Sequence, residues 1–178
     1  MPNTIILAED EATLYLQATT MPVWAPCGQT PVVLVDAQRD KVSFYGTLNL
    51  STGRETVTEA TKMDTEHTAE HLEQILAAYP DCPILLLWDR APWHGGEAVH
   101  NVLDENPRLE VMRFPVAAPD LNPQEHVWKA TRRAASHNHT LRRLPELADR
   151  FRKHLTGHTF KSSLLDHYGF NAIRPMFA

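Results

Sequence analysis

The chain has 178 residues, of which 43% are hydrophobic and 22% are charged, a size and composition typical of one globular domain with its own core. No apolar run reaches the roughly 18 residues of a membrane helix, and Met1-Pro2-Asn3 begins no signal peptide, so we expect a cytoplasmic protein with no membrane partner. Cys27 and Cys82 form no CxxC pair, which argues against a disulfide framework and a cysteine zinc site.

Charge is distributed unevenly along the chain, whose formal net charge is −5. Residues 1–128 hold 7 basic and 19 acidic side chains, whereas residues 129–161 hold 9 basic and 2 acidic ones. An acidic body followed by a basic segment is typical of a metal site beside a surface that binds a polyanion, but a charge run is equally typical of a solvated helix face. The basic segment includes Lys129, Arg132, Arg133, Arg142, Arg143, Arg150, Arg152 and Lys153.

The first third of the chain predicts antiparallel strands. Short runs of β-branched, aromatic or alternating apolar residues, separated by turn residues, are typical of strands. Such runs cover 5–8, 13–17, 31–36, 42–50 and 54–61, with a proline-rich loop at 20–31.

Three consecutive acids, Glu9, Asp10 and Glu11, follow the first of these runs. Adjacent carboxylates at the end of a strand repel one another unless a cation or basic side chains compensate them. They are also common in a polar hairpin turn that faces solvent. We therefore expect either a cation site or a turn at this point.

Helices alternate with strands from residue 64 onward. Helix starts and stops, together with apolar spacing, predict helices from Asp64 or Thr65 to Pro80 and at about 96–105, 123–136 and 144–155, with strands at 84–88 and 109–114. Early strands followed by this alternation predict an α/β fold with a mixed sheet flanked by helices. The sequence contains no glycine-rich phosphate loop, which argues against a nucleotide cofactor.

Two further acids follow these elements at informative places. Asp89 comes directly after the apolar run 84–88, and the carboxyl ends of such strands are where open α/β sheets bind ligands. Glu125 lies three residues after Asn122, a spacing that fits a capping box but also suits a metal ligand at a helix N-terminus. Asp89 could likewise be only a cap. A few carboxylates from separate elements are enough to bind Mg²⁺.

The sequences DRAPWH at 89–94 and PDLNPQEHVW at 119–128 resemble the second- and third-acid motifs of DDE transposases of the mariner-like superfamily, and most closely its bacterial insertion-sequence branch. The 35 residues between Asp89 and Glu125 match the spacing of that group. Asp10-Glu11 resembles the first acid, and WAPCGQTP at 24–31 is similar to the family's Trp-x-x-x-Gly loop.

This resemblance implies a ribonuclease H-like fold with a mixed five-stranded sheet, formed by residues 1–178 as a single catalytic domain. Asp10, Asp89 and Glu125 would be the catalytic triad and would hold Mg²⁺ or Mn²⁺, as two ions. The implied activity is DNA strand cleavage and strand transfer in transposition. The implied partners are element-end and target DNA and a second copy of the chain, at the nucleoid.

The resemblance also implies DNA contacts. We expect them from Arg90 and from His94, which could instead orient the site or only cap the turn. The basic segment adds Lys129, Arg132, Arg133, Arg142 and Arg143 as expected phosphate contacts. Arg90 stands where the family has Asn, and it would either contact phosphate or reduce activity. The family's N-terminal helix-turn-helix region is absent, so we expect one of three origins: a split element with that region on a separate polypeptide, a truncated relic, or an excised domain. Two alternatives stay open: a non-catalytic DNA-binding or assembly remnant of a decayed element, and a ribonuclease H-like nuclease without strand transfer.

The chain has ten histidines, and two groups of them resemble metal motifs. His137-Asn138-His139 lies beside a predicted helix end with basic neighbours, so we expect no zinc site there. His67 and His71 are four residues apart without the glutamate of a metalloprotease helix, and we expect them on a solvated helix face.

Overall fold

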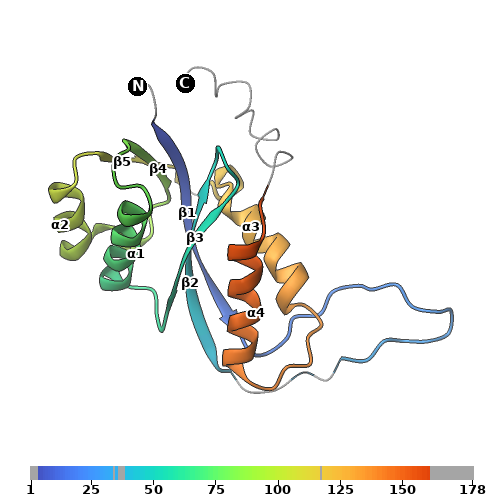
Figure 1. Ribbon diagram of the computed structural model, residues 1–178. Helices are drawn as coiled ribbons and strands as arrows, with labels where there is room; N and C mark the ends of the chain where they lie inside the picture. The colour runs from blue at the N-terminus through green and yellow to red at the C-terminus, as the bar shows by residue number, and fades with distance from the viewer. Residues whose placement is uncertain (1–3, 34, 36–38, 117, 161–178) are drawn as a thin grey trace.

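A computed structural model describes residues 4–33, 35, 39–116 and 118–160 (Figure 1). Its strands are β1 (Ile5–Tyr15), β2 (Lys41–Asn49), β3 (Glu55–Ala60), β4 (Ile84–Trp88) and β5 (Leu109–Arg113). Its helices are α1 (Thr65–Ala78), α2 (Glu97–Glu105), α3 (Gln124–Thr131) and α4 (Leu144–Gly157). Two short 3-10 helices are η1 (Pro92–Gly95) and η2 (Pro119–Leu121), and η3 (Arg132–Ser136) is a short π-helix. Within these residues no helix is long and apolar enough to span a membrane.

The strands form one sheet in the order β3-β2-β1-β4-β5. β1 pairs antiparallel with β2 and parallel with β4, β2 pairs antiparallel with β3, and β4 pairs parallel with β5. The mixed five-stranded sheet is therefore confirmed. The chain leaves β3 at one edge and returns through α1 as β4, on the other side of β1, so β1 is the central strand.

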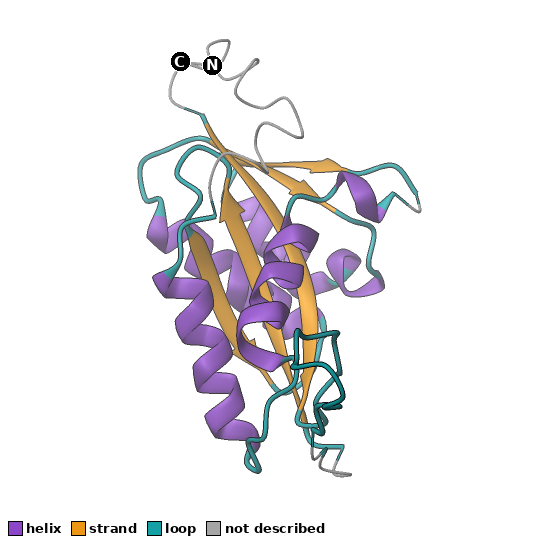
Figure 2. Ribbon diagram, turned by 90° about the vertical axis from the view of Figure 1, so that its right-hand side faces the viewer, coloured by secondary structure: helices purple, strands orange, loops and turns teal. Residues whose placement is uncertain are grey.

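Helices cover both faces of the sheet, α1 and α2 on one and α3 and α4 on the other (Figures 1 and 2). Side chains alternate between the faces along each strand. Leu7 accordingly packs with the core beneath α1 and α2, whereas Ile6 and Ala8 pack with the core beneath α3 and α4. The apolar face of α4, with Leu147, Phe151 and Leu155 fully buried, completes the second core.

The acids Glu9, Asp10 and Glu11 lie inside β1, so the two short strands with a turn between them were a wrong prediction. β2 pairs with β1 without interruption from Leu7↔Asn49 to Tyr15↔Lys41. Continuous pairing satisfies the backbone of the acidic segment, and this outweighs the low strand propensity of acidic residues. Parallel pairing with β4 covers only Ile5–Ala8, so the acids begin where the neighbouring strand ends.

The strand predicted at 31–36 is wrong for the residues that the structure describes. Residues 31–33 and 35 form no strand, and 34 and 36 lie outside the described residues. They belong to the long connection between β1 and β2, which extends away from the body (Figure 1), and Val32 is exposed. A β-prone sequence forms a strand only where a neighbouring strand pairs with it.

The segment His137-Asn138-His139 anchors this same connection between β1 and β2. The Asn138 side chain accepts a hydrogen bond from the Met21 amide and donates one to the Met21 carbonyl, both at 3.0 Å. His137 Nδ1 lies 2.6 Å from the Thr19 hydroxyl. These side chains therefore have a structural use that needs no zinc.

Candidate active site

A cavity of about 310 Å³ opens where β4 and β5 end, beside the start of α3. Asp10 from β1, Asp89 after β4 and Glu125 on α3 all line it, and so do Arg90 and Asn122. Loop residues complete the wall. The fold thus brings the three predicted acids together, although they lie far apart in the sequence.

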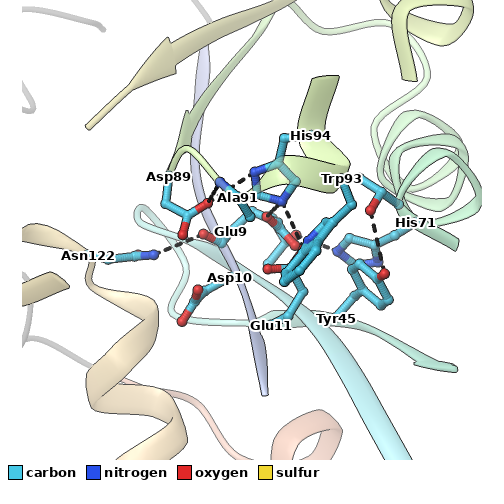
Figure 3. A network of polar contacts seen from close by, with 12 residues as sticks. Glu9, Asp10, Glu11, Tyr45, His71, Asp89, Ala91, Trp93, His94 and Asn122 are labelled. Carbon is cyan, nitrogen blue, oxygen red and sulfur yellow. Dashed lines mark hydrogen bonds and ion pairs between the residues drawn. The ribbon is translucent and has the colours of Figure 1, made fainter. Parts of the chain in front are cut away.

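Asp10 projects toward the face of the sheet that carries α3 (Figure 3). Trp128 Nε1 on α3 donates a hydrogen bond to Asp10 Oδ2 at 3.1 Å. Burial, and then the charges of Glu11 and Glu125, raise the pKa of Asp10 from 3.8 to about 8. The chain's own residues therefore do not compensate the charge of an ionised Asp10.

Gly46 allows α3 to approach Asp10 this closely. It pairs with Asp10 across the β1–β2 ladder. A Cβ at position 46 would lie 2.5 Å from Trp128 Cη2 and 2.5 Å from Gln124 Nε2, which is too close for the rigid indole ring. The absence of a side chain at this position is therefore what lets Trp128 reach Asp10.

Asp89 follows β4 at a sharp turn. Its Oδ1 accepts a hydrogen bond from the Ala91 amide at 2.8 Å and lies 3.0 Å from His94 Nδ1. The contact with His94 and the Ala91 hydrogen bond lower the pKa of Asp89 despite its partial burial. The cap-like contact expected of a lone aspartate is thus present, but it uses one oxygen, and the carboxylate also lines the cavity.

Residues 121–128 (LNPQEHVW), which form a Leu-Asn-Pro-x-Glu-x-x-Trp motif, build one wall of the cavity. Asn122 Nδ2 donates to the Glu9 carbonyl at 3.0 Å, and Asn122 Oδ1 accepts from the Gln124 amide at 3.1 Å, so Asn122 joins the start of α3 to β1. Among the residues that the structure describes, the Glu125 carboxylate makes no hydrogen bond back to Asn122. The capping box is therefore not formed, and Glu125 is exposed at the cavity.

Glu9 and Glu11 project to the opposite face of β1 from Asp10, toward His94 (Figure 3). His94 Nε2 lies 2.8 Å from Glu11 Oε1 and 4.0 Å from Glu9 Oε2. Burial, and then the charges of Glu11 and Asp10, raise the pKa of Glu9 well above its ordinary value. Burial disfavours the charge on His94, but the contacts with Asp89 and Glu11 outweigh it, and the pKa of His94 is raised.

The residues predicted to contact DNA lie in different environments. Arg90 lines the cavity, with its Nε donating to the Phe114 carbonyl at 3.0 Å. His94 has no exposed surface, a burial that is at odds with a direct DNA contact. Arg132 is half-buried and donates to the Thr13 carbonyl at 3.0 Å. The exposed members are Lys129, Arg133, Arg142 and Arg143, of which Arg143 pairs with Glu146 at 3.5 Å.

Two buried polar groups were not found from the sequence. Glu55 on β3 accepts a hydrogen bond from Gln124 Nε2 at 3.0 Å, and burial raises its pKa from 4.5 to about 8. His71, expected on a solvated face, is buried between the hydroxyls of Thr47 and Thr58, and burial lowers its pKa to about 3. Period-2 and period-3.6 patterns identify apolar faces, and a lone polar residue on such a face gives no signal.

A family described as DDE superfamily endonuclease matches residues 6–148, most of the chain and all three cavity acids. The chain belongs to this family. The resemblance that the motifs at 89–94 and 119–128 indicated is thereby confirmed.

The chain is also similar to a curated protein and to solved structures. The insertion element IS630 uncharacterized 39 kDa protein of Shigella sonnei is 26% identical over 135 residues, which are 75% of this chain and 39% of that protein. The Mos1 mariner paired-end complex with Mg has a TM-score of 0.68 at 14% identity, covering 98% of this chain and 56% of that one. The Mos1 transposase catalytic domain has a TM-score of 0.60 at 14% identity, covering 96% and 77%. These likenesses confirm the predicted ribonuclease H-like fold.

Proposed function

We propose that this DDE-superfamily chain is the catalytic domain of a transposase, cutting DNA at the ends of an insertion element and joining it to a target. The observation that carries the proposal is the single cavity lined by Asp10, Asp89 and Glu125. The chain spans 39% of the Shigella sonnei relative and about half of the mariner paired-end structures. The complete reaction is therefore proposed for the protein together with the regions that those relatives add.

The donor set fits a hard divalent cation. Mg²⁺ and Mn²⁺ bind carboxylate oxygens and accept a few protein ligands together with water. The pKa of Asp10 is raised to about 8 because burial and neighbouring carboxylates disfavour its charged form. A bound cation would stabilise that charged form. We propose two ions, since paired metals supply charge neutralisation to both the attacking and the leaving oxygen of a phosphodiester.

Neighbouring residues of the chain would orient the carboxylates that hold the metal ions. Trp128 engages Oδ2 of Asp10 and leaves Oδ1 for a ligand, while Ala91 engages Oδ1 of Asp89 and leaves Oδ2. Glu125, free of a capping bond, would complete the ligand set from α3. Phosphoryl transfer depends mainly on such positioning and on charge neutralisation, so a rigid set of three carboxylates is suited to it.

The exposed face of α3 would carry the DNA backbone away from the cavity. Glu125 and Lys129 on α3, and Arg133 on η3, which directly continues α3, follow one another at four-residue spacing and are all exposed. Residues at this spacing share a helix face, so two cations continue the line that begins at the proposed catalytic acid. Arg90 would contact a phosphate inside the cavity. Lys129, Arg132, Arg133, Arg142 and Arg143 would form the basic surface around it.

We also propose that two copies of the chain act together, because several of the similar structures are paired-end complexes of Mos1. In such an assembly each copy would engage one DNA end. Recognition of the end sequence by a helix-turn-helix on a separate polypeptide stays a prediction.

Nicking of a supercoiled plasmid that carries the DNA flanking the gene tests the proposal. We expect nicking that requires Mg²⁺ or Mn²⁺ and that the isosteric variant Asp89→Asn abolishes, while thermal unfolding shows the variant folded. Undiminished nicking by Asp89→Asn would contradict the proposal. Cleavage of an RNA–DNA hybrid with no nicking of the plasmid would instead favour a ribonuclease H-like nuclease.

One observation favours a second candidate, the non-catalytic remnant. Arg90 places a guanidinium in the wall of the cavity, where it can compensate carboxylates in place of a metal. A remnant of this kind would bind DNA but would take up no Mn²⁺ at the three acids. The variant Arg90→Asn would then create Mn²⁺ binding that the natural chain lacks.

A further inference from the structure

His94 occupies a closed position directly behind the cavity. The η1 turn directs its ring inward, where it stacks on Trp88 with ring centroids 3.9 Å apart and meets the edge of Trp93 at 6.2 Å. None of the residue is exposed to solvent. Its two nitrogens face two different carboxylates, Asp89 on one side and Glu11 on the other (Figure 3).

These two contacts link the two strands that carry acids of the cavity. Glu11 lies next to Asp10 on β1, and Asp89 follows β4. His94 Nε2 lies 2.8 Å from Glu11 Oε1, and His94 Nδ1 lies 3.0 Å from Asp89 Oδ1. The imidazole therefore spans the gap that opens where pairing between β1 and β4 ends.

The bridge determines which oxygen of Asp89 faces the cavity. Oδ1 accepts a hydrogen bond from the Ala91 amide and forms an ion pair with His94 Nδ1 at 3.0 Å, so the protein holds this oxygen from two sides. Oδ2 makes no hydrogen bond within the described part of the chain. The Asp89 side chain is 46% exposed and lines the cavity. Without that double contact, its carboxylate could rotate and exchange the positions of Oδ1 and Oδ2.

Glu11 holds His94 in turn. Its Oε1 accepts a hydrogen bond from Trp93 Nε1 at 2.7 Å in addition to the contact with His94. The Glu11 side chain is 3% exposed, so neither contact competes with water. Buried polar contacts of this kind orient a side chain far more strongly than exposed ones.

We propose that His94 is a positioning residue that, held by Glu11, fixes the Asp89 carboxylate so that Oδ2 is presented to the metal ions of the cavity. This inference rests on the proposed function and deepens it, because it assigns the support of one metal ligand. A buried group that orients a ligand typically changes metal affinity or activity by about 10- to 100-fold when it is lost.

The same cluster offers a competing explanation. Single ligand atoms of Glu9, Glu11 and His94 lie within 4.8 Å of one another, so these residues could themselves enclose a cation. Against this, His94 Nε2 and Glu11 Oε1 are at hydrogen-bond distance, and Trp93 donates to the same oxygen. A proton on the imidazole explains these contacts without an ion.

Calorimetric titration with Mn²⁺ on the wild-type protein and on His94→Phe tests the proposal. Phe keeps the aromatic stack on Trp88 but removes both polar contacts. We expect Mn²⁺ to bind at least about 10-fold more weakly and kcat for plasmid nicking to fall by a similar factor, with KM for DNA unchanged. His71→Phe is the matched control, because His71 is equally buried and also contacts two polar side chains, and it should leave Mn²⁺ affinity unaltered.

Two variants of Glu11 keep the test decisive if His94→Phe unfolds. Glu11→Gln retains an oxygen that accepts from His94 and Trp93, so it should keep Mn²⁺ affinity within a few fold, whereas Glu11→Ala should lose about as much as His94→Phe. Equal Mn²⁺ affinity in Glu11→Ala and the wild type would overturn the proposal.

Asp89→Asn separates this inference from the proposed function. If the wild type and Asp89→Asn bind Mn²⁺ equally, the proposed metal site itself is wrong. If Asp89→Asn loses binding but His94→Phe does not, only the positioning role is wrong. If His94→Phe removes a Mn²⁺ that Asp89→Asn retains, the ion lies among Glu9, Glu11 and His94, and the positioning role is again overturned.

Discussion

The two faces of β1 treat their acids in opposite ways. Asp10 faces the cavity and α3, with one oxygen held by Trp128. Glu9 and Glu11, its neighbours in sequence, face a closed interior where His94 and Trp93 surround them. Neighbouring positions on β1 thus differ in function: the Asp10 carboxylate is available to a ligand, whereas those of Glu9 and Glu11 face groups inside the protein.

The difference has a physical basis in desolvation. A buried carboxylate must be neutral or must have a buried partner. Glu9 meets this requirement through a raised pKa, and Glu11 meets it through contacts with His94 and Trp93. The pKa of Asp10 is also raised, to about 8, but Asp10 lines an open cavity, where a cation from solvent can replace the proton and stabilise the charge.

Isosteric changes of one acid on each face of β1 should show the largest difference in function. Asp10→Asn should lower plasmid nicking by about 10³-fold or more, as the loss of a group acting within a catalytic set does. Glu9→Gln changes a carboxyl group that faces away from the cavity and whose pKa burial raises well above its ordinary value, so its nicking rate should stay within a few fold of the wild type. Comparable losses in both variants would mean that the two faces do not differ in function.

Glu55 provides a pH-dependent test of burial away from the cavity. Its folded-state pKa, about 8, lies above the ordinary value of 4.5, so the folded chain keeps a proton that the unfolded chain has lost between these values. The free energy of unfolding should therefore fall as the pH rises across this window, by about 2 to 4 kcal/mol from pH 5 to pH 8.

Chemical denaturation of the wild type and Glu55→Gln at both pH values measures this contribution. The amide of Gln cannot ionise, so the variant should show a shallower decline than the wild type and should be the more stable protein at pH 8. Glu9 and Asp10 contribute declines of the same sign in both proteins, so only the difference between them reports on Glu55. Identical pH profiles would show that Glu55 is not desolvated.

Gly46→Ala sharpens the description of the cavity face. The added Cβ would collide with the Trp128 ring, and overpacking of this kind costs about 1 to 3 kcal/mol of stability. We expect lower unfolding free energy and slower nicking, because α3 must move and carries Trp128 and Glu125 with it. Gly157→Ala is the control, since a Cβ there meets no atom within 4 Å, and equal effects of the two changes would contradict the close-packing argument.

The smallest expected effect concerns the surface beyond the cavity. Removing Lys129 and Arg133 together should weaken binding to duplex DNA and should reduce the slope of log K against log salt by about 2, one for each lost phosphate contact. Arg152 and Lys153 give a matched pair of alanine changes, because both are already paired with Asp149 on α4. A slope that depends equally on both pairs would mean that only total charge matters.

The sequence predicted the cavity better than it predicted the strand that supports it. The Leu-Asn-Pro-x-Glu-x-x-Trp motif pointed to Glu125, and the structure gives each of its polar members a place at β1 or the cavity. The acidic run in β1 was expected at a strand end or in a turn, because strand propensity ignores the pairing that β2 supplies.

Long-range contacts account for the rest of what was missed. His94 was expected to contact DNA because it occupies the histidine position of the family motif, and only the packing of η1 against β1 shows that it meets Glu11. Glu55 in a short alternating strand gave no sign that Gln124 would cover it. Such contacts join residues separated by more than sixty positions, and local patterns carry no information on them.

The most direct test of the central claim is the position of Mn²⁺ in a crystal of the protein soaked with that ion, located by anomalous scattering. We expect Mn²⁺ density inside the cavity, with the ion coordinated by Asp10 Oδ1 and Asp89 Oδ2 and with Glu125 nearby. Density confined to the closed interior among Glu9, Glu11 and His94, or a cavity without Mn²⁺ at a concentration that supports nicking, would contradict the proposed metal site.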